Sequence, residues 1–453
     1  MWKRKAIAMV RKRKRCNKSG IFLENDMRTW KMAATGLVLL TACVACAKKE
    51  TSVSLIANPP RTVFLSTSDS YPGFEMPASC SDWTQFDALR LHVFNEGENM
   101  NLSYRVDDMT SKDFATRFSS DMPLRMVKGD NVLEISVAAL RQGNLFARGL
   151  DVSQLKSLRF FTTGLKENTA LQINDIRLIK RTAKGTKTVT DFAAKEAKTR
   201  IDAKDGTKIT AAENAGKAAV KMEITGGQYP GIGMMGFDKN WLGYDVMTLK
   251  LWTDDGKTLP DGVSVKVKDR SRQMTFSTSL VENKGEIRIP VEMTGQLSQG
   301  QLFEMSVFFP PSPGKTVYAG NITLEAFDRV EYPTVHASGE MDVPALVKAQ
   351  PLGMTLDFTA LKALGQNSVF MGMVMATVEG GKMRIVRCNS SVKGNTMYEI
   401  PADAFAGCKI GSTIEVWGYL TEHGIWHFRR VTLPFDGKLP MTVKFDDPKL
   451  FNH

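Results

Sequence analysis

Apolar and polar residues alternate with a period of two along several segments of the chain. In the segment 88–94, the apolar residues Leu89, Leu91 and Val93 fall on one face of an extended strand, with polar or aromatic residues between them. Such alternation predicts antiparallel sheets with one buried face, and several such strands separated by turn residues predict a β-sandwich. The best helical candidate, residues 193–203, is short and polar, so the chain is predicted to be all-β.

This strand pattern occurs twice. Tyr71-Pro72-Gly73 recurs as Tyr229-Pro230-Gly231, an offset of 158 residues. The other matches at this offset are Trp83 with Trp241, Phe86 with Tyr244, Asp87 with Asp245, and the strand 88–94 with 246–252. Agreement in spacing and character over this many positions predicts two copies of one fold, over residues 61–180 and 189–328.

A third module is predicted after Asp328. Residues 328–345 carry two prolines and a Ser-Gly pair and are interpreted as a linker. Beyond them two hairpins are predicted, one turning at Glu379-Gly380-Gly381 and one at His423-Gly424. Residues 346–453 are therefore predicted to form a C-terminal β-sandwich, either Ig-like or jelly-roll.

Four segments of the first repeat carry a family likeness. They are Ser81–Asp87, Gly129–Ile135, Leu150–Phe161 and Leu171–Leu178. With these segments the repeat resembles the galactose-binding-like jelly rolls that serve as carbohydrate-binding modules. The resemblance implies tandem jelly-roll sandwiches with a glycan as partner, and a structural calcium ion to which Asp175 would contribute. It implies no other cofactor.

The N-terminus carries an export pattern. A short basic stretch at 27–31 precedes an apolar segment at 33–40 that is too short to span a bilayer as a helix. The next residues, Leu40-Thr41-Ala42-Cys43, resemble the lipobox of bacterial lipoproteins, which implies lipidation of Cys43. This pattern predicts that translation starts at Met27. It divides the N-terminus into a leader upstream of that start (1–26), a signal peptide (27–42) and a tether (43–60). The alternatives are lipidation at Cys46, an ordinary signal peptide or an uncleaved apolar N-terminus.

Most of the formal net charge of +12 lies in this N-terminal part. Residues 1–42 carry +9, which leaves +3 for the rest of the chain. The run Arg11–Arg15 is typical of nucleic-acid patches, but it lies within the predicted leader. A nearly neutral folded part does not favour a nucleic-acid partner.

The candidate glycan site is predicted on outward positions of the sandwich strands, because a sugar site needs aromatic faces with polar groups beside them. The candidates are Arg90, His92, Phe94 and Arg105 in the first repeat, and Lys250, Trp252 and Lys266 in the second. The three in the second repeat are expected to share one outer face, with Trp252 as the stacking residue. The alternative is that the aromatic rings pack against loops or a neighbouring module. Tyr71 and Tyr229, each before Pro-Gly, are interpreted as turn anchors, and the alternative is that they line a ligand site at the loop tips.

No catalytic constellation is predicted. Asp107 and Asp108 are neighbours on a strand and point to opposite faces, so they cannot flank one glycosidic bond. Cys388 and Cys408 are a candidate disulfide, worth about 3 kcal/mol by the chain-entropy argument. The sequence thus predicts a non-catalytic, lipid-anchored protein of the bacterial cell envelope, placed at the outer membrane, that binds carbohydrate. The alternative is a structural or assembly subunit that uses its sandwiches for protein contacts.

Overall fold

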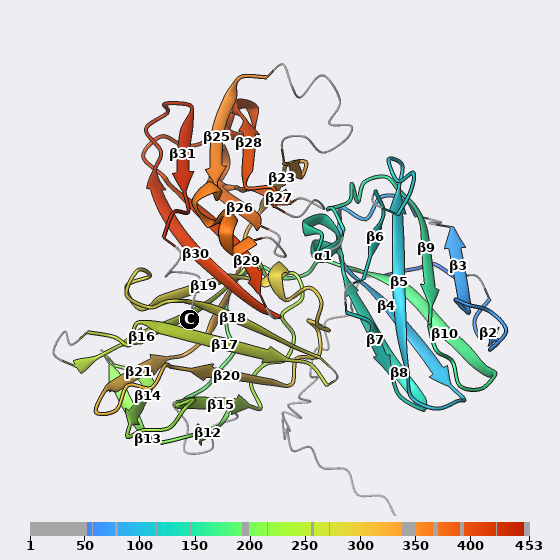
Figure 1. Ribbon diagram of the computed structural model, residues 1–453, viewed down its shortest axis with the longest axis horizontal. Helices are drawn as coiled ribbons and strands as arrows, with labels where there is room; N and C mark the ends of the chain where they lie inside the picture. The colour runs from blue at the N-terminus through green and yellow to red at the C-terminus, as the bar shows by residue number, and fades with distance from the viewer. Residues whose placement is uncertain are drawn as a thin grey trace, which may run out of the picture. The chain divides into compact units, whose positions relative to one another are not determined.

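The computed structural model describes most of the chain from Ser52 onward (Figure 1). The described residues are 52–56, 58–77, 80–114, 116–120, 122–144, 147–192, 199–214, 216–254, 258–270, 272–337, 350–365, 370–389, 394–422 and 424–447. The predicted leader, the signal peptide and Cys43 lie outside them. Within these ranges the structure has one α-helix, α1 (Val137–Gln142), and otherwise strands and short 3-10 turns, so the predicted all-β class is confirmed. No helix among the described residues is long and apolar enough to cross a membrane.

Repeat one (residues 52–180) is a sandwich of two antiparallel sheets. The first sheet has the order β1-β10-β4-β8, with β2 also on β10, and the second has the order β3-β9-β5-β6, with β7 on β5 (Figure 1). The strands are β1 (Ser52–Ser54), β2 (Arg61–Leu65), β3 (Gly73–Pro77), β4 (Phe86–Asn95), β5 (Met100–Asp108), β6 (Phe118–Ser119), β7 (Leu124–Met126), β8 (Gly129–Ser136), β9 (Leu155–Phe161) and β10 (Thr169–Lys180). Leu91 and its neighbours on β4 face Tyr104 and its neighbours on β5, which closes the core.

Repeat two (residues 185–326) has the same two-layer plan. One layer has the order β11-β22-β16-β21-β14-β13, with β19 on β16, and the other begins β12-β15-β20-β17-β18. The strands are β11 (Gly185–Thr188), β12 (Arg200–Lys204), β13 (Thr207–Asn214), β14 (Lys217–Ile224), β15 (Gly231–Met235), β16 (Val246–Trp252), β17 (Gly262–Lys268), β18 (Gln273–Ser279), β19 (Glu286–Pro290), β20 (Glu304–Phe308), β21 (Thr316–Gly320) and β22 (Thr323–Ala326). Leu249 on β16 and Val265 on β17 belong to the core between the layers.

Residues that match at the offset of 158 have the same structural role in the two repeats. Trp83 and Trp241 are 1% and 0% exposed, and each indole donates a hydrogen bond to the carbonyl three residues earlier. The distances are 2.7 Å to Cys80 and 3.1 Å to Asp238. Strands β3 and β15 also begin and end 158 residues apart. The predicted internal repeat is therefore confirmed in the structure.

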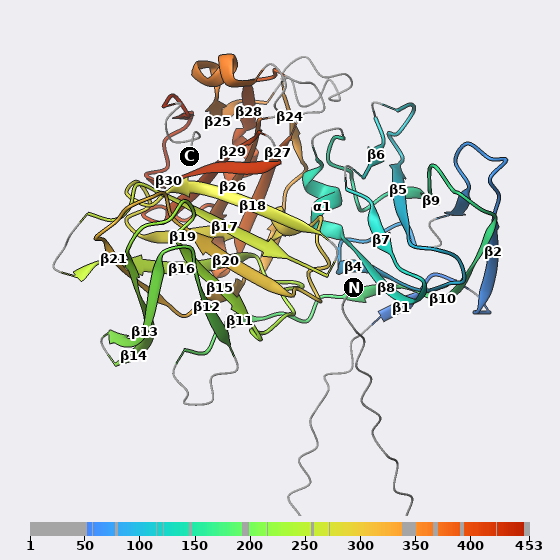
Figure 2. The same cartoon turned by 60° about the horizontal axis from the view of Figure 1, so that its bottom comes forward.

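The C-terminal module (residues 329–447) continues a sheet of repeat two. Strand β30 pairs in parallel with β18, and the sheet then runs β30-β29-β26-β27-β23, with β24 also on β27 (Figure 2). A separate three-stranded sheet has the order β28-β25-β31. The strands are β23 (Arg329–Glu331), β24 (Val335–His336), β25 (Leu352–Asp357), β26 (Phe370–Thr377), β27 (Met383–Asn389), β28 (Met397–Pro401), β29 (Thr413–Glu422), β30 (Ile425–Pro434) and β31 (Met441–Lys444).

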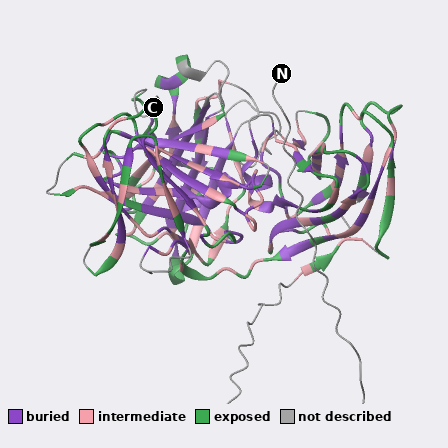
Figure 3. Ribbon diagram, turned by 90° about the horizontal axis from the view of Figure 1, so that it is seen from below, coloured by how far each residue is buried: buried purple, intermediate pink, exposed green. Residues whose placement is uncertain are grey.

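The module is not closed on itself as a separate two-sheet sandwich. Met373 and Trp417, on one face of the extended sheet, pack into the core of repeat two. Val374 and Val416, on the other face, pack with residues of the small sheet such as Leu356. Buried residues therefore run without interruption from repeat two into this module (Figure 3). The C-terminal module therefore shares its larger sheet with repeat two, and the two faces of that sheet serve two cores.

Two predicted connecting segments contain paired strands. The segment interpreted as a linker holds β23 and β24, which both pair in parallel with β27. The segment interpreted as a tether holds β1, which pairs with β10. Prolines and serines around these short strands led to the wrong interpretation, because two or three paired residues leave no periodic pattern.

The predicted disulfide is also wrong, since Cys388 and Cys408 are both free thiols. Cys388 lies opposite Gly372 on β26, whereas Cys408 bridges to Val378, just past the end of the same strand. Six residues of strand separate these positions, about 20 Å. A disulfide requires Cα atoms within about 7 Å. The predicted turn between β26 and β27 is confirmed, with Gly380 and Gly381 at φ of 76° and 72°.

Candidate functional site

The predicted ligand residues do not form one site in either repeat. Arg90, His92 and Phe94 lie on the outer face of the β4 sheet, while Arg105 lies on β5, in the opposite sheet of the sandwich. Lys250 and Trp252 are likewise on β16, and Lys266 is on β17 in the facing layer. The expectation that the last three share one outer face is wrong. Alternation along a strand tells outward from inward, but it does not tell which sheet the strand joins.

Several of these side chains are engaged in contacts within the protein. Arg90 donates to Glu134 Oε1 from Nε and Nη2 at 2.9 and 2.7 Å, and Glu134 Oε2 accepts from the Gly300 amide of repeat two at 3.0 Å. Arg90 therefore supports the contact between the repeats. His92 is exposed, with Nε2 3.9 Å from Asp130 Oδ1, and Phe94 beside it is half-buried.

Trp252 is also in contact with its neighbours. Its ring stacks on Tyr318, with centroids 5.8 Å apart and planes 12° apart, and the Tyr318 hydroxyl donates to Asp254 at 2.5 Å. Lys250 Nζ is 3.2 Å from Glu286. These contacts fit the alternative weighed from the sequence, in which the ring packs on residues of its own module.

Aromatic and cationic groups do come together on the outer face of β3-β9-β5 in repeat one. Tyr71 is 59% exposed, and its ring meets Phe161 edge-on at 5.8 Å and 77°. Phe161 lies on β9, between Gly73 of β3 and Ser103 of β5. We call this surface, made of Tyr71, Phe161, Arg105 and Arg159, the Tyr71 face.

The Tyr-Pro-Gly sequence explains why Tyr71 is held there. The Pro72 carbonyl accepts a hydrogen bond from the Thr162 amide at 2.9 Å, which ties the turn to the end of β9. A Cβ atom at Gly73 would lie 2.0 Å from the Phe160 carbonyl oxygen, so only glycine permits this close approach. The turn thus presents Tyr71 beside Phe161 from a rigid backbone.

Two arginines lie next to these rings. Arg105 on β5 and Arg159 on β9 are directly opposite each other in the strand register, and Glu75 on β3 is opposite Arg159 on its other side. Arg105 Nη2 is 3.5 Å from Asp107, and Arg117 Nε is 3.9 Å from the same carboxylate. The face therefore combines an exposed aromatic edge with guanidinium groups that can donate to a ligand.

Repeat two builds the same surface from β15, β20 and β17. Tyr229 is 60% exposed, and the Pro230 carbonyl accepts from the Phe309 amide at 2.8 Å. A Cβ at Gly231 would lie 2.0 Å from the Val307 carbonyl oxygen, as at Gly73. Phe308 occupies the register position of Phe161, and Lys266 Nζ lies 5.4 Å from its ring centroid. We call the surface made of Tyr229, Phe308 and Lys266 the Tyr229 face.

Sequence reasoning included Arg105 and Lys266, but it favoured turn anchors over a loop-tip ligand site for the two tyrosines. Both had been interpreted as turn anchors, and the backbone of the turn does perform that role. The signal that could have identified them is the recurrence of a large aromatic residue immediately before Pro-Gly in both repeats. A turn needs the Pro and the Gly, whereas nothing in the backbone geometry needs a tyrosine there.

The candidate calcium ligand is already neutralised. Asp175 forms an ion pair with Arg177, and Ser54 Oγ lies 3.4 Å from its other oxygen. Across the described ranges, no group of three or more His, Cys, Asp or Glu side chains is placed to hold a metal ion. These residues therefore do not fit a calcium site at Asp175.

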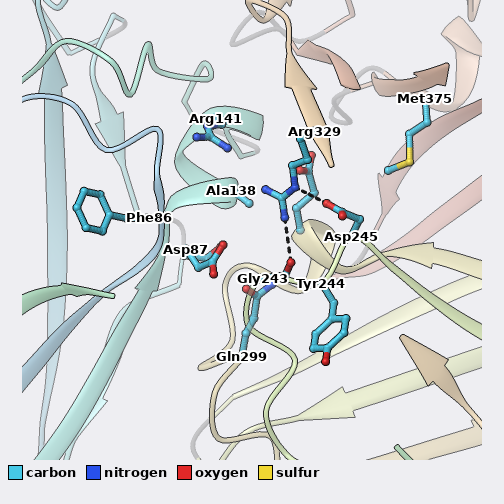
Figure 4. A pocket seen from close by; sticks show the side chains of 12 residues that line it. Phe86, Asp87, Ala138, Arg141, Gly243, Tyr244, Asp245, Gln299, Arg329 and Met375 are labelled. Atoms are coloured by element: carbon cyan, nitrogen blue, oxygen red, sulfur yellow. Dashed lines mark hydrogen bonds and ion pairs between the residues drawn. The ribbon is translucent and has the colours of Figure 1, made fainter. Parts of the chain in front are cut away.

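A small cavity lies where the repeats and the C-terminal module meet (Figure 4). Asp245 accepts from Arg181 Nη2 at 2.9 Å and from the Phe327 amide at 2.6 Å, and it contacts Arg329. Burial raises the pKa of Asp87 to about 6, against the opposing charges of Arg329 and Arg181. The cavity measures about 10 Å³, room for one water molecule, so it is a structural junction and not a glycan site.

A second ion-pair cluster joins the same parts. Arg387 on β27 contacts Glu292, in the 3-10 turn Val291–Thr294, at 2.6 Å and Glu331 on β23 at 2.5 Å. Arg141 of α1 lies 2.9 Å from Glu331. Burial alone would raise the pKa of Glu331, but Arg387 and Arg141 lower it to about 2. The repeats and the C-terminal module are thus linked by buried, mutually compensating charges.

Comparison with known proteins adds the following. No family model matches the chain, and no curated protein sequence matches it significantly. Among solved structures, it is similar to the family 11 carbohydrate-binding module of a cellulosomal cellulase of Clostridium thermocellum, at 14% identity and a TM-score of 0.26, over 32% of this chain and 96% of that one. The same type of module from that organism has been solved with a β-1,3-1,4-mixed-linked tetrasaccharide, at 16% identity, a TM-score of 0.26 and coverages of 32% and 98%.

A tandem of two family 22 carbohydrate-binding modules from Paenibacillus barcinonensis is also similar. It is 14% identical with a TM-score of 0.23, over 61% of this chain and 91% of that one. These neighbours are all-β carbohydrate-binding modules, the class of module that the first repeat resembles in sequence.

Proposed function

We propose that this protein is a non-catalytic carbohydrate-binding protein of the bacterial cell envelope, which holds a polysaccharide on its Tyr71 and Tyr229 faces. The observation that carries the proposal is the repetition of one surface. Each repeat presents a tyrosine about 60% exposed immediately before its Pro-Gly pair, with a half-buried phenylalanine at the equivalent register position and a cationic side chain on the neighbouring strand.

The chemistry of both faces suits a sugar. The apolar faces of sugar rings stack on exposed aromatic side chains, and neighbouring charged or hydroxyl groups bind the sugar hydroxyls. The outer face of a sheet is open along its length, so it can receive a chain and not only a single sugar. Asp107, next to Arg105 on this side of the sheet, is engaged by Ser157 at 3.2 Å and by Arg105 at 3.5 Å.

The location in the envelope is part of the same proposal. The Leu-Thr-Ala-Cys sequence supports lipidation of Cys43 after translation from Met27. Mass spectrometry of the native N-terminus is expected to find a diacylated Cys43, and Cys43→Ser is expected to release the protein from membranes, because stable anchoring requires the acyl chains. An unmodified Cys43 in the native protein would contradict this part.

Binding is tested with the full chain carrying Cys43→Ser on a glycan array, followed by titration of each hit. Tyr71→Ala and Tyr229→Ala are each expected to weaken binding by about 1–3 kcal/mol, the range of a stacked aromatic anchor. Phe64→Ala is the matched control, because Phe64 is 82% exposed but lies on β2 in the other sheet. Equal losses in all three variants, or no glycan bound at all, would overturn the proposal.

One observation favours the alternative of an assembly subunit. Among the strands that the structure describes, β2 pairs only with β10, which leaves its other edge without a partner strand there, and β2 carries the exposed Phe64 ring. An open edge beside an exposed ring suits pairing with a strand of another protein. Under this alternative Phe64→Ala, and not Tyr71→Ala, would abolish the function.

A further inference from the structure

We infer that both faces select an anionic glycan, one that carries carboxylate or sulfate groups. This inference rests on the proposed function and specifies the ligand of the same two faces. It is carried by the way cations are placed beside the aromatic rings in each repeat.

The Tyr71 face holds two guanidinium groups at directly opposed strand positions. Arg105 and Arg159 are register partners on β5 and β9, where side chains on one face lie about 5 Å apart at Cβ. Like charges in this arrangement repel each other and cost stability unless an anion lies near both. An anion bound between them would remove that repulsion, so this face suits a negatively charged group.

The acids near these arginines do not neutralise them. Among the described residues, no carboxylate forms an ion pair with Arg159 within 4 Å. Arg105 has one carboxylate contact, to Asp107 at 3.5 Å, and its Nε is buried without an acceptor. Asp107 is in turn shared with Arg117 at 3.9 Å and Ser157 at 3.2 Å. Arg105 and Arg117 thus share one carboxylate, and the acid directly opposite Arg159 in the strand register is the exposed Glu75.

The Tyr229 face is cationic too, although its residues differ. At the positions of Glu75 and Arg159, repeat two has Gly233 and Ser306, so both a negative and a positive charge are replaced. The Lys204 side chain from β12 reaches over Gly233, since a Cβ there would lie 2.4 Å from Lys204 Cε. Lys204 and Lys266, the latter above the Phe308 ring, place two cations next to the aromatic surface, where the carboxylate of Glu304 is held by Lys268 at 2.9 Å and by Ser306 at 3.1 Å.

A neutral glycan would not require this arrangement. Exposed rings and hydroxyl-binding groups are sufficient for neutral sugars, whereas paired guanidinium groups match the two oxygens of a carboxylate or the oxygens of a sulfate. Both repeats place two cations beside the aromatic rings, by different side chains on different strands. We therefore assign these cations to ligand binding and not to the folding of either sheet.

The test compares matched probes on the full chain carrying Cys43→Ser, by titration calorimetry. Oligogalacturonates supply carboxylates, dextran sulfate supplies sulfates, and dextran and mixed-linkage β-glucan oligosaccharides supply neutral controls. We expect an acidic probe to bind at least tenfold more tightly than either neutral probe at low salt, with the preference reduced at about 0.5 M NaCl, because exposed charge interactions are screened. The stronger of the two acidic probes identifies the charged group.

Two charge-removing variants sharpen the test. Arg159→Gln and Arg105→Gln keep a polar side chain but lose the cation, and each is expected to weaken acidic-probe binding about tenfold while neutral-probe binding changes less than twofold. Arg61→Gln, an exposed arginine on β2, is the matched control and should change neither. Unfolding temperatures of all variants establish that each is folded.

The outcomes separate this inference from the proposed function. Neutral probes that bind as tightly as acidic ones would overturn the inference and leave glycan binding intact. No binding to any probe would overturn both. Acidic binding that is unaffected by Arg159→Gln and by Tyr71→Ala would be polyanion attraction to the protein at large, which would also overturn the inference.

Discussion

Asp87 in repeat one and Asp245 in repeat two occupy the same position of one repeated sequence, yet their surroundings differ. Asp245 is held by Arg181, Arg329 and a backbone amide, whereas Asp87 is buried against Gly243 with no hydrogen bond to any described residue (Figure 4). The two repeats thus share the packing inside each sandwich, such as the buried tryptophan, but not the charges that a neighbouring module supplies.

The largest effect is expected at the buried tryptophans that the two repeats share. Trp83→Ala and Trp241→Ala are each expected to lower the free energy of unfolding by about 3–5 kcal/mol, because both indoles are fully buried. Urea denaturation measures the loss. A tryptophan whose replacement costs less than about 1 kcal/mol would show that the two repeats do not share this packing. Tyr229→Ala, at an exposed site, is the control and should change stability by about 0.5 kcal/mol or less.

The carboxylate of Asp245 should be almost as costly to remove as either tryptophan. Asp245→Ala leaves Arg181 and Arg329 without their shared partner in a buried junction, and breaking such a pair typically costs about 3–5 kcal/mol. Thermal unfolding at neutral pH measures this loss. Asp69→Ala, on an exposed turn of repeat one, is the control. Equal effects of Asp245→Ala and Asp69→Ala would contradict the assignment.

Removing the carboxylate of Asp87 should stabilise the protein at neutral pH, whereas removing that of Asp245 should destabilise it. The pKa of Asp87 is raised from 3.8 to about 6 in the folded protein, so the folded state keeps its proton after the unfolded chain has lost it. Its stability contribution is complete below pH 4 and is lost as the pH rises to 6, a change of about 3 kcal/mol in order of magnitude. Asp87→Asn removes this titration.

We therefore expect the Asp87→Asn variant to gain stability relative to the native protein as the pH rises from 4 to 7. Urea denaturation at several pH values measures the difference between the two proteins. A difference that does not change with pH would show that Asp87 ionises normally in the fold.

The smallest effect is expected at the cysteines. Because Cys388 and Cys408 are free and distant, a reducing agent should leave the unfolding temperature of the full chain carrying Cys43→Ser unchanged. Under the disulfide interpretation, reduction would cost about 3 kcal/mol and lower that temperature by several degrees. Mass mapping after thiol alkylation of the unfolded protein gives an independent answer.

The sequence predicted the repeat and the inward face of its strands because these depend on local periodicity. Leu89 and Leu91 are buried as their alternation requires, and Trp83 matches Trp241. It could not predict that β4 and β5 belong to opposite sheets, which is why Arg90 and Arg105 were grouped into one site. It also could not predict the pairing of β18 with β30, since nothing in either strand specifies a partner 150 residues away.

That pairing has a consequence for how the chain is made. Thr275 on β18 faces Ile425 on β30, so the edge of β18 stays unpaired until about 150 further residues have been synthesised. At about 5–20 residues per second this takes roughly 10–30 s, during which an open strand edge can pair wrongly with other chains. Under the export proposed above, a nascent chain held unfolded until translocation would avoid this interval, and a chain truncated before Ile425 should accumulate as aggregate.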